Sequence, residues 1–182
     1  YDEKAVKLAL GVPGLDVNET DDTGQSVLWV QCFRGRIRNV KLLLADPRVD
    51  PNLPEQNGLT PLHAAAGQGR VRCVEVLLSD PRVDPNTANT VKGPLHVAAQ
   101  EGKDRCVELL LADPRVDPNL CDLQGYTPLN LAASKGMDCC VELFLGDKRV
   151  DVCLADLRGE TPLLSACVQL MNSMDQVGAP GD

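Results

Sequence analysis

Eight cysteines and two histidines are the residues of this 182-residue chain that could bind a metal, form disulfides or act as nucleophiles. Cys73, Cys106 and Cys140 recur at one position of a repeated segment. Zinc sites usually hold two ligands about two to four residues apart, and the chain has no Cys-x-x-Cys pair. Packed helices lie about 8 to 10 Å apart, too far for the Cα spacing of about 4.4 to 6.8 Å of a disulfide. We therefore expect these three cysteines to be small buried hydrophobic residues, with no metal and no cofactor.

The histidines and carboxylates do not form a catalytic set. His63 and His96 occupy the same position in two successive repeats, and a catalytic residue needs no such copy. Asp21 and Asp22 are adjacent acids in a turn, and no phosphate-binding glycine loop occurs. The chain is therefore not expected to be an enzyme. The other thiols fit a reducing setting, which predicts a cytoplasmic or nuclear protein; they are Cys32, Cys121, Cys139, Cys153 and Cys167.

The amino-acid composition and net charge argue against some classes of binding partner. Hydrophobic residues make up 43% of the chain and charged residues 24%, as in ordinary globular proteins. The formal net charge of −8 argues against nucleic acid or an anionic membrane as partner, and we expect no basic stripe. No apolar run reaches the length of about 18 residues that a membrane span needs. The chain begins at Tyr1 without Met, as a fragment of a larger protein would.

A repeat of about 34 residues must position all of these side chains. The stretch LLSDPRVDPN at 77–86 has close copies at 43–52 and 110–119 and a looser one at 144–153. Self-similarity at that period predicts a solenoid, in which each unit buries its apolar face against its neighbours. The same helix ending and turn recur because every unit must end its second helix at the same point and turn toward the next unit in the stack.

Each repeat encodes two helices. Thr60 can cap a first helix and Pro61 suits its first position, while Gly69 supplies the left-handed residue that ends it. Val74 and Leu77 then mark the apolar face of a second helix, which ends before Pro81. In the first full unit, Ser26, Val27 and Trp29 stand where the second full unit has Thr, Pro and His, which predicts a weak helix start.

The segments GLTPLHAAAGQGR (58–70) and GYTPLNLAASKG (125–136) resemble ankyrin repeats, and the resemblance covers roughly residues 1–171. It implies an all-α solenoid of stacked antiparallel helix pairs with projecting β-hairpin loops. Residues 1–182 then form a single ankyrin repeat domain. Its parts are a half repeat at 1–16, full repeats at 17–50, 51–84, 85–117 and 118–151, a partial repeat at 152–171 and a tail at 172–182. The hairpin of the third full unit lacks one residue and should be distorted.

The resemblance also implies a binding surface of hairpin tips and first-helix ends on the concave face. Large side chains at these positions are unexpected for solubility alone, and aromatic and Arg residues dominate binding energies in protein interfaces. We expect a protein or an extended peptide as partner and a monomeric domain. The predicted partner-binding residues are Phe33, Arg34, Leu59, Gln68, Lys92, Glu101, Leu123, Tyr126, Lys135 and Leu157.

Two other hypotheses remain open. The array could be a spacer that stacks end to end with further repeats or another domain, because both of its ends are half units. It could also be a substrate of an asparagine hydroxylase, since the ankyrin family implies modification of an Asn in the turn after the second helix. The matching residues are Asn18, Asn52, Asn86 and Asn119, although Pro precedes three of them where Val is usual.

Overall fold

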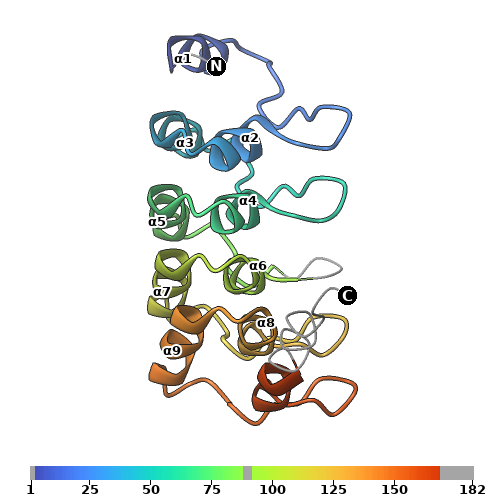
Figure 1. The fold of residues 1–182 in the computed structure, drawn as a ribbon. Helices are drawn as coiled ribbons and strands as arrows, with labels where there is room; N and C mark the ends of the chain where they lie inside the picture. The colour runs from blue at the N-terminus through green and yellow to red at the C-terminus, as the bar shows by residue number, and fades with distance from the viewer. Residues whose placement is uncertain (1–2, 88–91, 169–182) are drawn as a thin grey trace, which may run out of the picture.

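The computed structural model describes residues 3–87 and 92–168, whose helices stack in pairs along one axis (Figure 1). The first helices of the units are α2 (Val27–Arg34), α4 (Pro61–Gly67), α6 (Pro94–Gln100) and α8 (Pro128–Lys135). The second helices are α1 (Glu3–Leu10), α3 (Ile37–Leu44), α5 (Val71–Ser79), α7 (Asp104–Ala112) and α9 (Asp138–Gly146). Residues 162–168 are also helical and follow α9 in the position of a first helix. The predicted all-α solenoid is confirmed.

Two columns of helices make up the stack. The first helices pack in the order α2, α4, α6, α8, and the second helices in the order α1, α3, α5, α7, α9. Loops project from the side of the first helices (Figure 1). These loops are hairpin-shaped turns, closed for example by the bond from Glu55 N to Leu59 O at 3.0 Å. Strand pairing in the described residues is limited to the bridge between Thr20 and Ser26. Residues 88–91, where a distorted hairpin was predicted, lie outside the described residues.

Local signals start and end the first helices as predicted. Pro61 is the first residue of α4, and Gly69 has a φ of +65° after its end. The prediction of a weak start for α2 is wrong. The Ser26 hydroxyl accepts a hydrogen bond from Trp29 N at 3.2 Å, so serine caps this helix as threonine caps α8.

The core runs through the whole stack as columns of equivalent residues. One column of the second helices is Val40, Val74 and Val107, and the next is Leu43, Leu77, Leu110 and Phe144; all are buried. Cys73, Cys106 and Cys140 form a third buried column, and all eight cysteines are free thiols. The prediction that these three act as small hydrophobic residues is confirmed. Because each column residue contacts neighbours above and below, the units stabilise one another.

Candidate functional site

The tips of the last two hairpins expose a pair of leucines. Leu123 is 65% exposed and Leu157 is 79% exposed. They hold equivalent positions on neighbouring hairpins, which are joined by the bond from Leu157 N to Gln124 O at 3.1 Å. Asp22 and Gln56 take this position on the earlier hairpins. We call the hairpin tips and first-helix ends the binding strip; at this hairpin position the strip is polar on the first two hairpins and apolar on the last two.

Phe33 is an exposed aromatic side chain with a fixed support. Its ring stacks on Trp29 with 5.3 Å between centroids and 11° between planes, and the side chain remains 39% exposed. Trp29 is itself held, because its indole N–H donates to the Leu59 carbonyl of the next hairpin at 3.0 Å. Phe33 can therefore contact a partner without first losing much side-chain freedom, which favours binding.

Some of the other predicted contact residues are exposed, and the rest are half-buried or hydrogen-bonded to other side chains. Arg34, Gln68, Glu101 and Lys135 are exposed at the ends of the first helices. Leu59 and Tyr126 are half-buried, and burial together with the nearby Asp156 carboxylate raises the pKa of the Tyr126 phenol. The Lys92 amine donates to the Gln100 side chain, whose amide donates to Glu101 at 3.1 Å. Tyr126 is thus less accessible than the leucine pair beside it.

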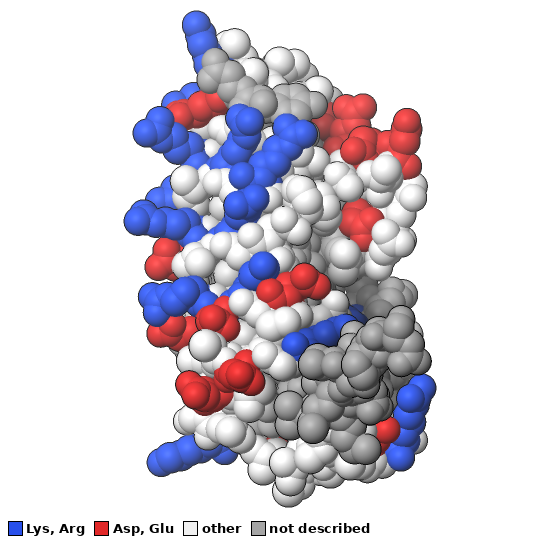
Figure 2. Space-filling view, viewed as in Figure 1, with Lys and Arg blue, Asp and Glu red and all other residues white. Residues whose placement is uncertain are grey.

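A group of basic side chains covers the N-terminal units where each first helix turns into the second. Figure 2 shows Lys and Arg gathered over α2, α3 and α5, while Asp and Glu cluster at the neighbouring hairpins. We call this group the basic face; its exposed members are Arg34, Arg36, Arg38, Arg70 and Arg72. The expectation that no basic stripe exists is therefore wrong. Stacking aligns equivalent basic residues of successive units in a column along the array. The formal net charge of −8 does not reveal this alignment.

The two histidines are structural, as expected. The Nδ1 atom of His63 lies 3.1 Å from the Thr60 backbone N–H, which can only donate, and its Nε2 atom lies 2.8 Å from the Lys92 carbonyl, which can only accept. These partners fix the neutral tautomer with the proton on Nε2. Trp29, His96 and Asn130 occupy the same position and donate to the next hairpin in the same way. The residues of this column therefore connect each first helix to the hairpin of the following unit by a hydrogen bond.

The cysteines of the second helices that are buried pack in the core. Burial raises the pKa of the Cys106 thiol to about 11, and burial with the nearby Asp104 raises that of Cys140 to about 12. Such thiols are poor nucleophiles at neutral pH.

Among residues 3–87 and 92–168, no group of three or more His, Cys, Asp or Glu side chains is arranged to hold a metal ion. None of the helices in these ranges is long and apolar enough to cross a membrane.

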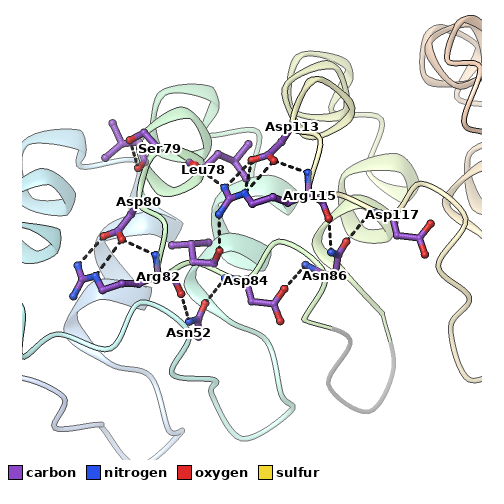
Figure 3. Close-up of polar contacts among 12 residues, drawn as sticks. Asn52, Leu78, Ser79, Asp80, Arg82, Asp84, Asn86, Asp113, Arg115 and Asp117 are labelled. Carbon is purple, nitrogen blue, oxygen red and sulfur yellow. Dashed lines mark hydrogen bonds and ion pairs between the residues drawn. The ribbon is translucent and has the colours of Figure 1, made fainter.

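The turns after α3, α5, α7 and α9 each contain a hydrogen-bonded Asp–Arg pair that sequence analysis missed. Asp113 accepts from the Arg115 backbone N–H at 2.9 Å and from its guanidinium at 2.7 Å (Figure 3). The same guanidinium donates to the carbonyls of Leu78 at 2.7 Å and Val83 at 3.0 Å, both in the preceding unit. The pairs are Asp46–Arg48, Asp80–Arg82, Asp113–Arg115 and Asp147–Arg149. Each arginine thus satisfies an otherwise unpaired carbonyl at the end of the previous second helix.

The four candidate modification residues also connect neighbouring turns. Asn52 donates from its side-chain amide to Arg82 O at 2.7 Å and accepts from Asp84 N at 2.9 Å. Asn18, Asn86 and Asn119 make the same two bonds to the turn one unit further on. The DPRVDPN segment is therefore repeated because Asp, Arg and Asn together connect each turn to its neighbours. Hydroxylation of these asparagines stays a prediction.

Replacing Arg82 by alanine is expected to lower the free energy of unfolding by about 1–2 kcal/mol, because one charged side chain loses its bonds to Asp80 and to two carbonyls. Arg82→Lys retains the charge without the planar fork and should fall between the wild type and Arg82→Ala. Urea unfolding followed by circular dichroism measures both. Arg72→Ala removes an exposed arginine of the same unit and is expected to change stability by less than about 0.5 kcal/mol. Equal losses for Arg72 and Arg82 would contradict this role.

Comparison with known protein families agrees with this geometry. The family model described as ankyrin repeats (3 copies) matches residues 1–89 and 95–175, which is most of the chain. Among curated proteins, none matches the chain. The paired helices, the projecting hairpins and the matched ranges lead to one assignment: the chain belongs to the ankyrin repeat family.

Proposed function

We propose that this chain is a non-catalytic interaction module that binds a partner protein or extended peptide along the hairpin tips and first-helix ends. Ankyrin repeats are in general protein–protein interaction modules. The observation that carries the proposal is the exposure of large apolar side chains on rigid supports. Phe33 is stacked on Trp29, and Leu123 and Leu157 lie on hydrogen-bonded hairpins. Preorganised side chains of this kind bind at a low entropic cost.

The charge distribution supports a partner that has an acidic region and an apolar region. The basic face adjoins Phe33, since Arg34 follows it in α2 and Arg70 donates to the Phe33 carbonyl at 3.1 Å. A partner with acidic residues toward the N-terminal units and apolar residues toward Leu123 and Leu157 would complement both regions. Exposed charges of this kind increase the rate of association more than the affinity. The association rate should therefore fall as salt is raised.

Removing the exposed apolar groups is expected to weaken binding at least tenfold, because buried interface anchors often contribute about 2 kcal/mol or more. A partner is first captured from a cell lysate with the wild-type chain. Its affinity is then measured by titration calorimetry for Phe33→Ala and for the double variant Leu123→Ser, Leu157→Ser.

The matched control is Leu145→Ser. Leu145 is an exposed leucine in α9, in the column of second helices rather than on the strip. This change should leave the affinity unaltered. A loss of binding with Leu145→Ser, while the strip variants bind normally, would move the site to the second helices and refute the proposal.

Asparagine hydroxylation is an additional proposal with a structural requirement. Both the amide N–H and the amide oxygen of the Asn52 side chain are hydrogen-bonded in the turn. Its three counterparts form the same bonds. A hydroxylase that needs an extended substrate would have to open these bonds. We therefore expect modification only when the array is unfolded or newly made. The intact mass of the protein purified from its native cell tests this, because each hydroxylation adds one oxygen atom.

A further inference from the structure

Two columns of basic residues, here called the basic columns, recur at the start of successive second helices and contain most of the basic face. The first column occupies the N-cap position and consists of Arg36, Arg70 and Lys103. The second column lies two residues further along the chain and consists of Arg38, Arg72 and Arg105. In the fourth full unit the same two positions hold Met137 and Cys139. The basic columns therefore run along the first three full units and do not continue into the fourth.

The fold does not require basic residues at these positions. A helix N-terminus has a partial positive charge, so acidic and short polar residues are preferred there and cations are unfavourable. The N-cap residues Arg36, Arg70 and Lys103 form no side-chain cap hydrogen bond. Within the described residues, Arg70, Arg72 and Lys103 also form no ion pair. Mutual repulsion of these cations in the free protein favours the binding of an anionic partner.

The preceding unit positions the stems of the first column. Arg70 lies across Gly35, the residue that ends α2, so a Cβ atom at Gly35 would come within 2.9 Å of Arg70 Cδ. The Nε atom of Arg70 donates to the Phe33 carbonyl at 3.1 Å. Lys103 lies across Gly69 in the same way, with 3.3 Å from that Cβ position to its Cδ. Because the stems are already placed, a partner pays less to order these side chains.

Acidic side chains border the basic columns on both sides. Figure 2 shows Asp and Glu clustered at the hairpins that adjoin the basic face. On the other side, Glu75 and Glu108 are exposed on the second helices, about one turn beyond Arg72 and Arg105, and Glu108 forms an ion pair with Arg105. A wide polyanion such as a DNA duplex or an anionic membrane would meet these acids. The charge pattern therefore favours a narrow partner, a single extended chain.

The spacing along the columns matches one extended conformation. The second helices pack in series, so equivalent residues of neighbouring units lie about 8–10 Å apart. A polyproline II helix rises about 3.1 Å per residue and has three residues per turn. Every third side chain then points the same way, at intervals of about 9 Å. An acidic residue at every third position would thus place one carboxylate at each unit.

We propose that the basic columns bind an extended acidic segment of a partner protein, in the polyproline II conformation, with Asp or Glu at every third position. The carboxylates accept hydrogen bonds from the guanidinium groups of successive units, a geometry that suits arginine. The segment runs along the array over the first three full units. It is the acidic part of the partner in the proposed function, and its recognition rests on that function.

Two peptides of identical composition and charge test the spacing. In Glu-Pro-Pro-Glu-Pro-Pro-Glu the acids recur at every third position, whereas in Glu-Glu-Glu-Pro-Pro-Pro-Pro they are adjacent. Binding is measured by fluorescence anisotropy at low salt, where exposed charges are little screened. The spaced peptide is expected to bind about fivefold more tightly or better, because the clustered acids reach fewer units. Equal affinities, or no binding of the spaced peptide, would overturn the proposal.

The double variant Arg70→Gln, Arg72→Gln removes the two middle cations and is expected to weaken binding of the spaced peptide about fivefold or more. Both changes remove a cation from the start of α5, which a helix tolerates, and circular dichroism verifies the fold. The matched control is Lys148→Gln, Arg158→Gln, which changes the net charge equally at exposed positions outside the columns. Its affinity should stay within about twofold of the wild type. Equal losses in the two double variants would refute the assignment of the columns.

Two further measurements separate this proposal from its alternatives. A DNA duplex should not displace the spaced peptide at an equal concentration of negative charge, and displacement would show that a narrow segment is not the preferred anion. The variant Leu123→Ser, Leu157→Ser should bind the spaced peptide as the wild type does, because the peptide has no group for these exposed leucines. The two proposals can therefore fail separately. A negative peptide result leaves the apolar contacts of the binding strip standing, and a negative calorimetry result with the leucine variant leaves the peptide result standing.

Discussion

Replacing Leu110 by alanine is expected to lower the free energy of unfolding by about 2–5 kcal/mol. Leu110 is fully buried in α7, which packs between α5 and α9. Removing three carbon atoms there leaves a cavity that stacked helices on both sides cannot easily close. Urea unfolding followed by circular dichroism at 222 nm, the usual helix signal, measures the loss.

The same change should weaken the cooperativity of the array. Stability in a repeat protein is a sum of unit stabilities and of interfaces between neighbours. The Leu110→Ala variant weakens the third full unit and the two interfaces that hold it. We therefore expect the single unfolding transition of the wild type to broaden or to split in two. Leu111→Ala is the control, because Leu111 is only partly buried in the same helix. If both variants lost equal stability, burial at position 110 would not explain the effect.

The helices could be predicted from the sequence because their signals are local. Thr60 and Pro61 start α4, and a glycine with positive φ follows its end. The spacing of Val74 and Leu77 identified the buried face of α5. Each of these signals acts within one or two helical turns, so it can be recognised without knowing where the next unit lies.

The Asp–Arg pairs could not be predicted in the same way. Arg82 has the appearance of a surface charge in a turn, and its partners Leu44 and Val49 are more than thirty residues away. Which carbonyl it reaches depends on the rise from one unit to the next, and that rise follows from the packing of complete helices. The recurrence of Asp, Arg and Asn at fixed positions in every DPRVDPN copy was the available signal.

Of the large side chains predicted to be exposed at the candidate site, Phe33, Leu123 and Leu157 are exposed, whereas Leu59 and Tyr126 are half-buried. Sequence register placed Leu157 and Tyr126 on hairpins, yet Leu157 is 79% exposed and Tyr126 is half-buried beside Asp156. Side-chain exposure depends on how adjacent hairpins tilt, which a single repeat does not encode. The basic face was missed for a related reason, because its arginines come from different units and only the stack brings them together.

His63 should make the protein less stable as the pH falls from about 6.5 to about 4. Burial, helped by the neighbouring His96, lowers the pKa of His63 from its ordinary value of 6.5 to about 4, against the opposing effects of the Lys92 carbonyl and Glu55. The unfolded chain therefore binds a proton in this interval that the folded chain does not. By linkage, the contribution of His63 is fully present above pH 6.5 and is lost as the pH falls toward 4. The shift corresponds to about 3 kcal/mol over the whole interval.

The matched variant is His63→Asn, because the fourth full unit uses Asn130 at the same position. Asn130 accepts from Thr127 N at 3.0 Å and donates toward Glu160 O, so it replaces both histidine contacts without a titrating group. Urea unfolding at pH 7 and at pH 4.5 is expected to show a smaller acid loss for this variant than for the wild type. The loss that remains includes that of His96, whose pKa is also lowered by burial. The aspartates of the turn pairs contribute little to this difference, because the stability from their lowered pKa values is lost mainly as the pH falls below the ordinary value of 3.8. Equal acid losses in the two proteins would show that His63 is not the group responsible.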